Sequence, residues 1–135
     1  MSSFSLQIVT PDGLFFDGEA EKMLVRTIGG DVCILPRHCD YVTALGMGEA
    51  QIWADGRKRT AACIGGMLAV TAGRVRVVAT TFEWSDDIDL ERAERSAQRA
   101  REILAGNKLT SQEIELAQAR LKRALVRSSV AQRKQ

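Results

Sequence analysis

The stretch "RVRVVATTFEWSDDIDLERAERSAQRA", residues 74–100, contains the change of hydrophobic period that decides the fold. In its first part Val75 and Val77 alternate with arginines, which is the two-residue period of a strand with one buried face. In and just after its second part small and apolar residues recur in steps of four, three and four, at Ala93, Ala97, Ala100 and Leu104. These steps are typical of a helix, so we expect strands to give way to helix near residue 85.

The chain before residue 85 reads as short strands separated by turns. The segment "FSLQIV" (4–9) alternates apolar and polar residues, and "TPDG" (10–13) supplies a turn. The dipeptides Asp55-Gly56 and Ala72-Gly73 each separate two further strand patterns, and Asp-Gly is a strong signal for a β-hairpin because both residues tolerate positive φ. We expect an antiparallel β-sandwich or flattened barrel.

Two helices are expected after residue 85. Ser85 or Asp86 is expected to cap the first helix, and Gly106-Asn107 to end it. The segment "TSQE" (110–113) is a capping box for the second helix. The second apolar stripe consists of Ile114, Ala117, Leu121 and Ala124. Alanine-rich stripes let two antiparallel helices approach closely but bury little apolar area, so the fold class is α+β with a movable helical hairpin.

Composition and charge describe a globular chain with two different parts. Of its 135 residues 45% are hydrophobic and 27% charged, which excludes a disordered tail. Residues 1–85, the expected sandwich domain, carry eight Lys or Arg and nine Asp or Glu, whereas residues 86–135, the expected hairpin, carry eleven and eight. The segment 117–135 has six basic residues and no acid. This end is expected to be a partner surface or a basic frayed end.

Two features of the sequence bear on the cellular compartment of the chain. The start shows no basic and apolar signal pattern, and the longest weakly polar run, 62–73, is shorter than the ~20 residues that a membrane helix needs. Three cysteines without paired spacing fit free thiols in a reducing compartment. We expect a cytosolic chain that meets a membrane only through a partner, with no direct membrane span.

The segment "CILPRHCD" (33–40) suggests a metal or thiol site at first sight. Cys33, His38 and Cys39 supply at most three ligands without the paired spacing of zinc sites. Neighbouring side chains rarely form a nucleophile and its base. We therefore expect no metal site and no catalytic residue here, although a thiol or metal enzyme remains an alternative.

The charged face of the first helix has two interpretations. Asp89 with Arg92 and Glu91 with Arg95 are spaced three and four residues apart, and each such pair stabilises a helix by about 0.2–0.5 kcal/mol. A solvated salt-bridge face therefore explains much of the pattern. Composition alone favours this interpretation.

The other interpretation is an anion site. Arginines recur two turns apart in the first helix and one turn apart in the second, at Arg92, Arg99, Arg123 and Arg127. If these faces turn inward together, the guanidinium groups repel one another unless a polyanion such as phosphate lies among them. Nucleic acid is disfavoured because the chain has no interleaved aromatic residues and no recognised module.

Longer segments carry a family resemblance across essentially the whole chain. They are "IVTPDGLFFDGEAEKMLVRTIGGDVCILPRHCDYVTALGMGEAQI" (8–52), "AACIGGMLAV" (61–70), "DIDLERA" (87–93) and "LKRALVR" (121–127). In order, spacing and length the sequence resembles the epsilon subunit of bacterial F-type ATP synthase. The resemblance implies a β-sandwich of about ten strands followed by a helical hairpin.

The resemblance also implies a function. The chain would be a non-catalytic central-stalk subunit, not an enzyme, that couples transmembrane ion flow to ATP synthesis by rotation. Its expected partners are the gamma subunit and the rotor ring of c subunits, contacted by the sandwich, and the catalytic alpha and beta subunits, contacted by an extended hairpin. It would lie peripherally on the cytoplasmic face of the bacterial membrane. No cofactor is required.

The resemblance further implies a hairpin with two states, as in many bacterial members, which inhibits ATP hydrolysis when it is extended. ATP as a regulatory ligand would select the folded state. The family motif I/L-D-x-x-R-A is present, and with further matching positions the implied ATP-binding residues are Glu83, Ile88, Asp89, Arg92, Ala93, Arg99, Arg123 and Arg127. Implied partner contacts are His38, Arg120, Lys122, Arg123 and Arg127. The resemblance thus favours the anion site over the solvated face.

The sequence departs from the family pattern in two places. Cys33, Cys39, Asp40 and Tyr41 replace the usual residues of the loop around His38. Trp84 and Ser85 replace Arg-Pro before the helical hairpin, which alters the expected hinge. A second functional class stays open: a free-standing ATP-sensing adaptor on the same fold, which would bind nucleotide without a stalk partner.

Overall fold

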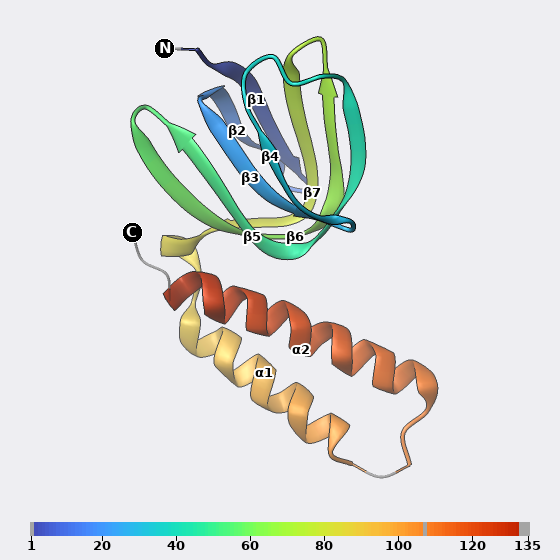
Figure 1. Ribbon diagram of the computed structural model, residues 1–135. Helices are drawn as coiled ribbons and strands as arrows, with labels where there is room; N and C mark the ends of the chain where they lie inside the picture. Colours follow the sequence, from blue (N-terminus) through green and yellow to red (C-terminus); the bar gives the residue numbers. More distant parts are fainter. Residues whose placement is uncertain (1, 107, 133–135) are drawn as a thin grey trace. The chain divides into compact units, whose positions relative to one another are not determined.

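The computed structural model describes residues 2–106 and 108–132. Two compact units follow one another along the chain and divide between Trp84 and Ser85. The elements (Figure 1) are β1 Phe4–Thr10, β2 Gly13–Ala20, β3 Lys22–Thr27, β4 Gly30–Ile34, β5 Tyr41–Ala54, β6 Arg57–Thr71, β7 Arg74–Trp84, the 3-10 helix η1 Ser85–Asp87, α1 Leu90–Leu104 and α2 Ser111–Gln132.

The first unit is one sheet with the strand order β2-β1-β7-β6-β5-β3-β4. Strands β1 and β7 pair in parallel, and the other neighbours are antiparallel. Figure 1 shows that the sheet curls on itself, so that its two halves face each other across a core. The expected α+β class, a β-sandwich followed by two helices, is confirmed.

Both β-hairpin turns expected from the sequence are confirmed. Asp55 and Gly56 have φ values of 53° and 73°, and they join β5 to β6 with Ala54 opposite Arg57. Ala72 and Gly73 have φ values of 51° and 78° and join β6 to β7. Positive φ at both central residues gives these turns the twist that matches the flanking strands.

The expected number of strands, about ten, is wrong: the described residues form seven. The difference arises because β5, β6 and β7 are 14, 15 and 11 residues long and stay paired while they curve (Figure 1). Gly66 shows how closely two of them approach. Its φ is +125°, and a Cβ there would lie 2.0 Å from the carbonyl oxygen of Val78. Only glycine fits this position without a backbone shift.

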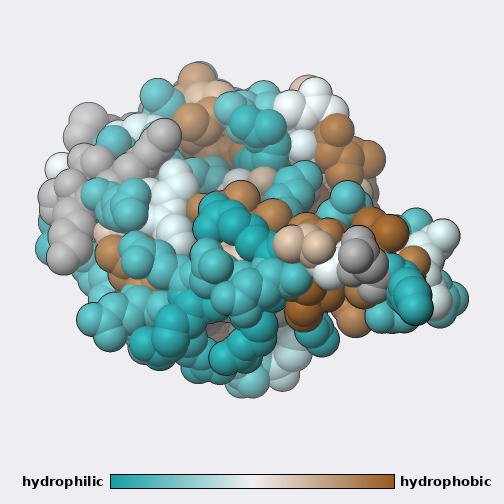
Figure 2. Space-filling view, turned by 90° about the horizontal axis from the view of Figure 1, so that it is seen from below, coloured by the Kyte–Doolittle hydropathy of each residue, from teal (hydrophilic) through white to brown (hydrophobic). Residues whose placement is uncertain are grey.

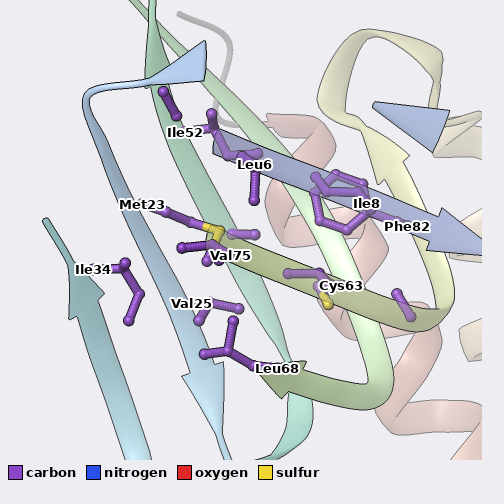
Figure 3. Close-up of a cluster of buried hydrophobic side chains, with 14 of the residues drawn as sticks. Leu6, Ile8, Met23, Val25, Ile34, Ile52, Cys63, Leu68, Val75 and Phe82 are labelled. Atoms are coloured by element: carbon purple, nitrogen blue, oxygen red, sulfur yellow. The ribbon is translucent and has the colours of Figure 1, made fainter. Parts of the chain in front are cut away.

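The core of the sandwich consists of large apolar side chains on the inner face of the sheet. Alternation in β1 buries Phe4, Leu6 and Ile8, as the two-residue period predicts. Figure 3 shows the side chains of several strands pointing toward one another, among them Leu6, Ile8, Met23, Ile34, Ile52 and Leu68. This core lies entirely within the first unit.

The second unit is a helical hairpin whose two helices meet along small residues. We call the buried alanines Ala93, Ala97 and Ala100 of α1 and Ala117 and Ala124 of α2 the seam; each is at most 5% exposed. The seam confirms the alanine positions of the predicted stripes, but not their larger members: Leu104 and Leu121 are only half-buried, and Ile114 is exposed. Most other helical positions are exposed and polar, and Figure 2 shows mainly hydrophilic residues on the face it views. No described helix is both long and apolar enough to cross a membrane.

Candidate functional site: the arginine face of the helical hairpin

The start of α1 is fixed by Asp89. Its backbone is extended, with φ −80° and ψ 99°, and its Oδ1 accepts a hydrogen bond of 3.0 Å from the backbone N–H of Arg92. Asp89 is therefore the N-cap of α1. The expectation that Ser85 or Asp86 caps this helix is wrong, because both residues belong to the separate 3-10 turn η1 and the chain becomes α-helical only at Leu90.

The start of α2 is the predicted capping box. Glu113 N donates to Thr110 Oγ1 at 3.1 Å, and Thr110 N donates to Glu113 Oε1 at 3.4 Å. Two amides at the start of the helix thus gain partners from nearby side chains. The end of α1 is closed by backbone bonds, with the N–H of Gly106 donating to the carbonyl of Ile103 at 3.1 Å. Asn107, the other residue expected to end α1, lies outside the described residues.

An open groove runs along one side of the seam. It has a volume of about 600 Å³ and is lined from both helices, among others by Glu94, Gln98 and Arg101 of α1 and by Leu125 of α2. Each of these four residues comes one position after a seam alanine, namely Ala93, Ala97, Ala100 or Ala124. One step along a helix is a rotation of about 100°. The groove therefore marks one common side of the hairpin.

The four arginines that the resemblance implies for ATP binding lie on the opposite side. Arg92, Arg99 and Arg123 come one position before seam alanines, so each is rotated about 100° the other way. Arg127 likewise precedes Ser128, which follows Ala124 by one helical turn. The groove shows that the residues one position after the seam alanines lie on the same side of the hairpin in both helices. The residues one position before these alanines therefore share the opposite side. We call Arg92, Arg99, Arg123 and Arg127 the arginine face.

Charge pairing differs between the two sides. Glu91 and Arg95, both lining the groove, approach within 3.8 Å in an exposed ion pair. Asp89, expected to pair with the Arg92 side chain, instead bonds its backbone amide. Among the described residues of the hairpin, no carboxylate pairs with the guanidinium of Arg92, Arg99 or Arg123. Cations brought together without counterions favour binding of an anion.

The remaining candidates from the helical segment take different positions. Ile88 is half-buried just before the cap, and Ala93 is buried in the seam, where its methyl group packs between the helices. Arg120 is exposed one turn before Arg123 on the arginine face. Lys122 is exposed and is offset from this row.

Glu83 and His38 belong to the sandwich unit. Glu83 is half-buried on β7 opposite Ala62 of β6. His38 lies in the loop between β4 and β5, where its Nδ1 donates to the Cys39 carbonyl at 2.7 Å and its ring lies 5.8 Å from that of Tyr41. Both contacts are local and orient the imidazole within the loop. Of the eight implied ATP-binding residues, seven thus lie in the second unit, and Glu83 lies in the first.

The three cysteines differ in their exposure to solvent. Cys33 and Cys39 are exposed, whereas Cys63 is buried in the core. Burial disfavours the thiolate and raises the pKa of Cys63 to about 12, so the thiol is protonated at neutral pH. Within residues 2–106 and 108–132, no three His, Cys, Asp or Glu side chains form a group that could hold a metal ion.

The groove was not anticipated from the sequence. Its polar wall includes Arg95, Gln98, Ser128 and Gln132, residues that look like ordinary exposed helix positions. The sequence did contain one signal for the groove: the residues one position after the alanines of each stripe lie on one side of their helix. That signal becomes informative only when both helices are known to face each other along these alanines.

The fold and the site define a class, a β-sandwich with a basic helical hairpin. Comparison with known families divides the chain one residue later: residues 3–85 match the beta-sandwich domain of the ATP synthase delta/epsilon chain, and residues 86–132 match its long alpha-helix domain. The chain belongs to the ATP synthase delta/epsilon chain family. As a member it is a structural subunit of ATP synthase rather than an enzyme in its own right.

Individual relatives agree over nearly the full length. The ATP synthase epsilon chain of Ruminococcus albus is 41% identical over 135 residues, covering 99% of this chain and 100% of the relative. That of Caldicellulosiruptor bescii is 35% identical over 132 residues, covering 98% and 96%. A chain in the Euglena gracilis mitochondrial ATP synthase structure has a similar fold, with a TM-score of 0.83 at 17% identity, covering 96% of this chain and 81% of that one.

Proposed function

We propose that this chain, as an epsilon-type subunit, binds the gamma subunit and the ring of c subunits through its sandwich and couples transmembrane ion flow to ATP synthesis by rotation. Its place would be the cytoplasmic face of the bacterial membrane. We further propose that the helical hairpin regulates ATP hydrolysis and binds ATP on the arginine face. The full-length similarity to ATP synthase epsilon chains supports the first part.

The arginine face carries the regulatory part of the proposal. Arg92 and Arg99 of α1 and Arg123 of α2 share one side of the hairpin without a carboxylate partner among its described residues. A guanidinium group is always charged at neutral pH and binds phosphate oxygens through two parallel N–H donors. A triphosphate would offset the repulsion among these groups and connect the two helices.

Binding of this kind would act as a conformational switch. ATP contacts arginines of both helices only while the hairpin is closed, so it stabilises the closed state and leaves an extended state unaffected. In the extended state, the acid-free basic segment of α2, including Arg120 and Lys122, would reach the catalytic alpha and beta subunits and inhibit hydrolysis. ATP would then release inhibition. Glu83 and the His38 loop are proposed as further contacts, to ATP and to stalk partners respectively.

Calorimetric titration of the full chain with ATP tests the binding site. Arg92→Ala removes a charge from the arginine face, and Arg101→Ala is the matched control because it removes the same charge from the groove side of the same helix. A charge-assisted hydrogen bond contributes about 1.5–3 kcal/mol. We therefore expect Arg92→Ala to weaken ATP binding by about ten- to a hundredfold and Arg101→Ala to change it less than about threefold.

The opposite results are equally clear. Equal losses in both variants would mean that ATP senses only the net charge of the hairpin, and no saturable binding at several millimolar would return the arginines to a solvent- or partner-facing role. Co-purification with gamma tests the stalk function independently. ATP binding by a chain that forms no complex with gamma would support a free-standing ATP-sensing adaptor instead.

A further inference from the structure

One of the five positions on the face of α2 that meets α1 carries a polar side chain. These positions recur in steps of four, three, four and three, and they are Ala117, Leu121, Ala124, Ser128 and Ala131. The predicted stripe of α1, by contrast, contains only alanine and leucine. Ser128 therefore places a hydroxyl group in a row whose other members, on both helices, are apolar.

The hydroxyl of Ser128 is buried without a partner. Its Oγ forms no hydrogen bond to any group of residues 2–106 and 108–132. A serine in a helix can donate to the carbonyl four residues earlier, here that of Ala124, but the described structure does not contain this bond. Gln98 lines the same groove from α1, yet its Nε2 donates to Glu102 Oε1 at 3.4 Å. Ser128 thus lacks the hydrogen bond that buried polar atoms normally have.

We propose that Ser128 is a destabilising element of the closed hairpin, which keeps the closed and extended states close in free energy. Closure removes water from the hydroxyl and offers no partner in return, whereas separation of the helices lets water bind it again. The two-state hairpin belongs to the proposed function, so the regulatory part of this inference rests on that proposal. The unfavourable burial of the hydroxyl does not depend on it.

The cost of this burial is comparable with the gain from the seam. The seam consists of five alanines, each at most 5% exposed, and so of five buried methyl groups. A buried hydroxyl without a partner costs about as much free energy as roughly one to four buried methyl groups gain. One serine therefore offsets a large share of what these methyl groups contribute to closure. A ligand that prefers one of two nearly balanced states shifts their populations easily.

Replacement of the hydroxyl by hydrogen tests the proposal. Ser128→Ala removes the hydroxyl, but it also raises helix propensity, because alanine is the best helix former. Ser129→Ala is the matched control, since Ser129 is the next residue of α2 and is exposed. Both variants gain the same propensity, so a difference between them measures the effect of the buried hydroxyl.

Amide hydrogen exchange in α1 reports closure of the hairpin. This helix has 15 residues, and isolated helices of such length are marginal in water, so its amides exchange when the two helices separate. In the full chain without ATP, NMR should show exchange at Ala97 and Ala100 slowed about five- to a hundredfold by Ser128→Ala and less than about threefold by Ser129→Ala. Because these amides lie in α1, the change reports contact between the helices rather than propensity within α2.

Hydrolysis of ATP by the assembled complex tests the regulatory consequence. A chain that favours the closed state should inhibit hydrolysis less, because the extended state is the proposed inhibitory one. We expect complexes with Ser128→Ala to hydrolyse ATP about twofold or more faster than complexes with Ser129→Ala.

Each contrary result overturns a stated part of the proposal. Equal exchange in the two variants, or faster exchange in Ser128→Ala, would mean that the hydroxyl has a partner in the closed state, and the proposal fails. Slower exchange with equal hydrolysis would overturn the role of Ser128 in regulation. If the complexes show no inhibition with any variant, the proposed function fails, and exchange at Ala97 still decides whether Ser128 destabilises the closed hairpin.

Discussion

The two units of this chain are held together by side chains of very different size. The sandwich buries Leu6, Ile8 and Ile52, each at most 1% exposed, whereas the helical hairpin closes on alanines. Complete burial of a leucine or isoleucine side chain contributes about 1.5–3 kcal/mol, but a single methyl group contributes only about 0.8 kcal/mol. Per buried position, the hairpin therefore gains much less from closing than the sandwich gains from folding.

This difference fits the proposed division into a rigid sandwich and a hairpin that changes state. A sandwich with a large core keeps one structure, and its turns and edges can serve as fixed contact surfaces. A seam of alanines permits close approach of the helices at a small free-energy gain, so that binding of a few kcal/mol is enough to shift its equilibrium. Such a hairpin suits the proposed regulation by ATP.

The largest expected effect is a cavity in the sandwich core. Leu6→Ala removes a side chain that is 0% exposed, so it should lower the free energy of unfolding by about 2–5 kcal/mol. Urea denaturation followed by tryptophan fluorescence measures this directly, since Trp53 and Trp84 both lie in the sandwich. Leu14→Ala, at a position that is 58% exposed, is the control and should change stability by less than about 0.5 kcal/mol. Equal losses in the two variants would contradict the described core.

The next effect concerns the close approach of β6 and β7. Gly66→Ala places a Cβ 2.0 Å from the Val78 carbonyl oxygen at a φ of +125°, so the backbone must shift. We expect a loss of about 2–4 kcal/mol in the same urea experiment. Gly56→Ala is the control: its φ is +73° but nothing lies within 4 Å, and it should cost only about 1 kcal/mol. A cost at Gly66 no larger than at Gly56 would show that the two strands are not so close.

The seam should respond to an added side chain rather than to a lost one. Ala97→Leu inserts three carbons where the helices touch and should destabilise the closed hairpin by about 1–3 kcal/mol. Thermal melting followed by circular dichroism at 222 nm reports the helices, and tryptophan fluorescence should stay unchanged. Ser96→Leu adds apolar bulk at an exposed neighbouring position and should change the stability of the hairpin by less than about 0.5 kcal/mol. A stabilised hairpin in Ala97→Leu would mean that the seam is loosely packed.

The smallest effect is expected at the capping box. Thr110→Ala removes the acceptor of the 3.1 Å bond from Glu113 N and should destabilise α2 by about 1 kcal/mol. Faster amide exchange at Glu113, about fivefold, is the expected signature, with the sandwich amides unchanged. Ser111→Ala alters the adjacent exposed hydroxyl, which makes none of the capping bonds, and should leave the exchange rate of Glu113 within about twofold.

Local signals in the sequence were read correctly where the interaction is itself local. The Asp55-Gly56 turn and the Thr110 capping box involve residues at most a few positions apart, so their chemistry is contained in short segments. The N-cap of α1 was predicted wrongly although it is local. Ser85, Asp86 and Asp89 are all suitable caps, and only the intervening 3-10 turn decides that the last one is used.

The candidate site depends on contacts between distant segments, which the sequence does not reveal. The sequence indicates that arginines recur along both helices, but repeats in separate helices share a face only if the helices pair in a particular rotation. The groove supplied that information, because Gln98 and Leu125 line one side and so place Arg99 and Arg123 on the other. Asp89, which belongs to the implied ligand motif, also bonds the amide of Arg92, and this contact was not predicted.

By itself the sequence determined the α+β class, the change from strands to helices near residue 85 and the basic character of the second helix, because hydrophobic period and charge are properties of short segments. The tertiary structure decided that three long curved strands replace several short ones, that Gly66 must be glycine, and that the arginines of α1 and α2 share a face. Each of these depends on which distant segments touch. Contact between residues far apart in the chain is settled by packing of the whole unit.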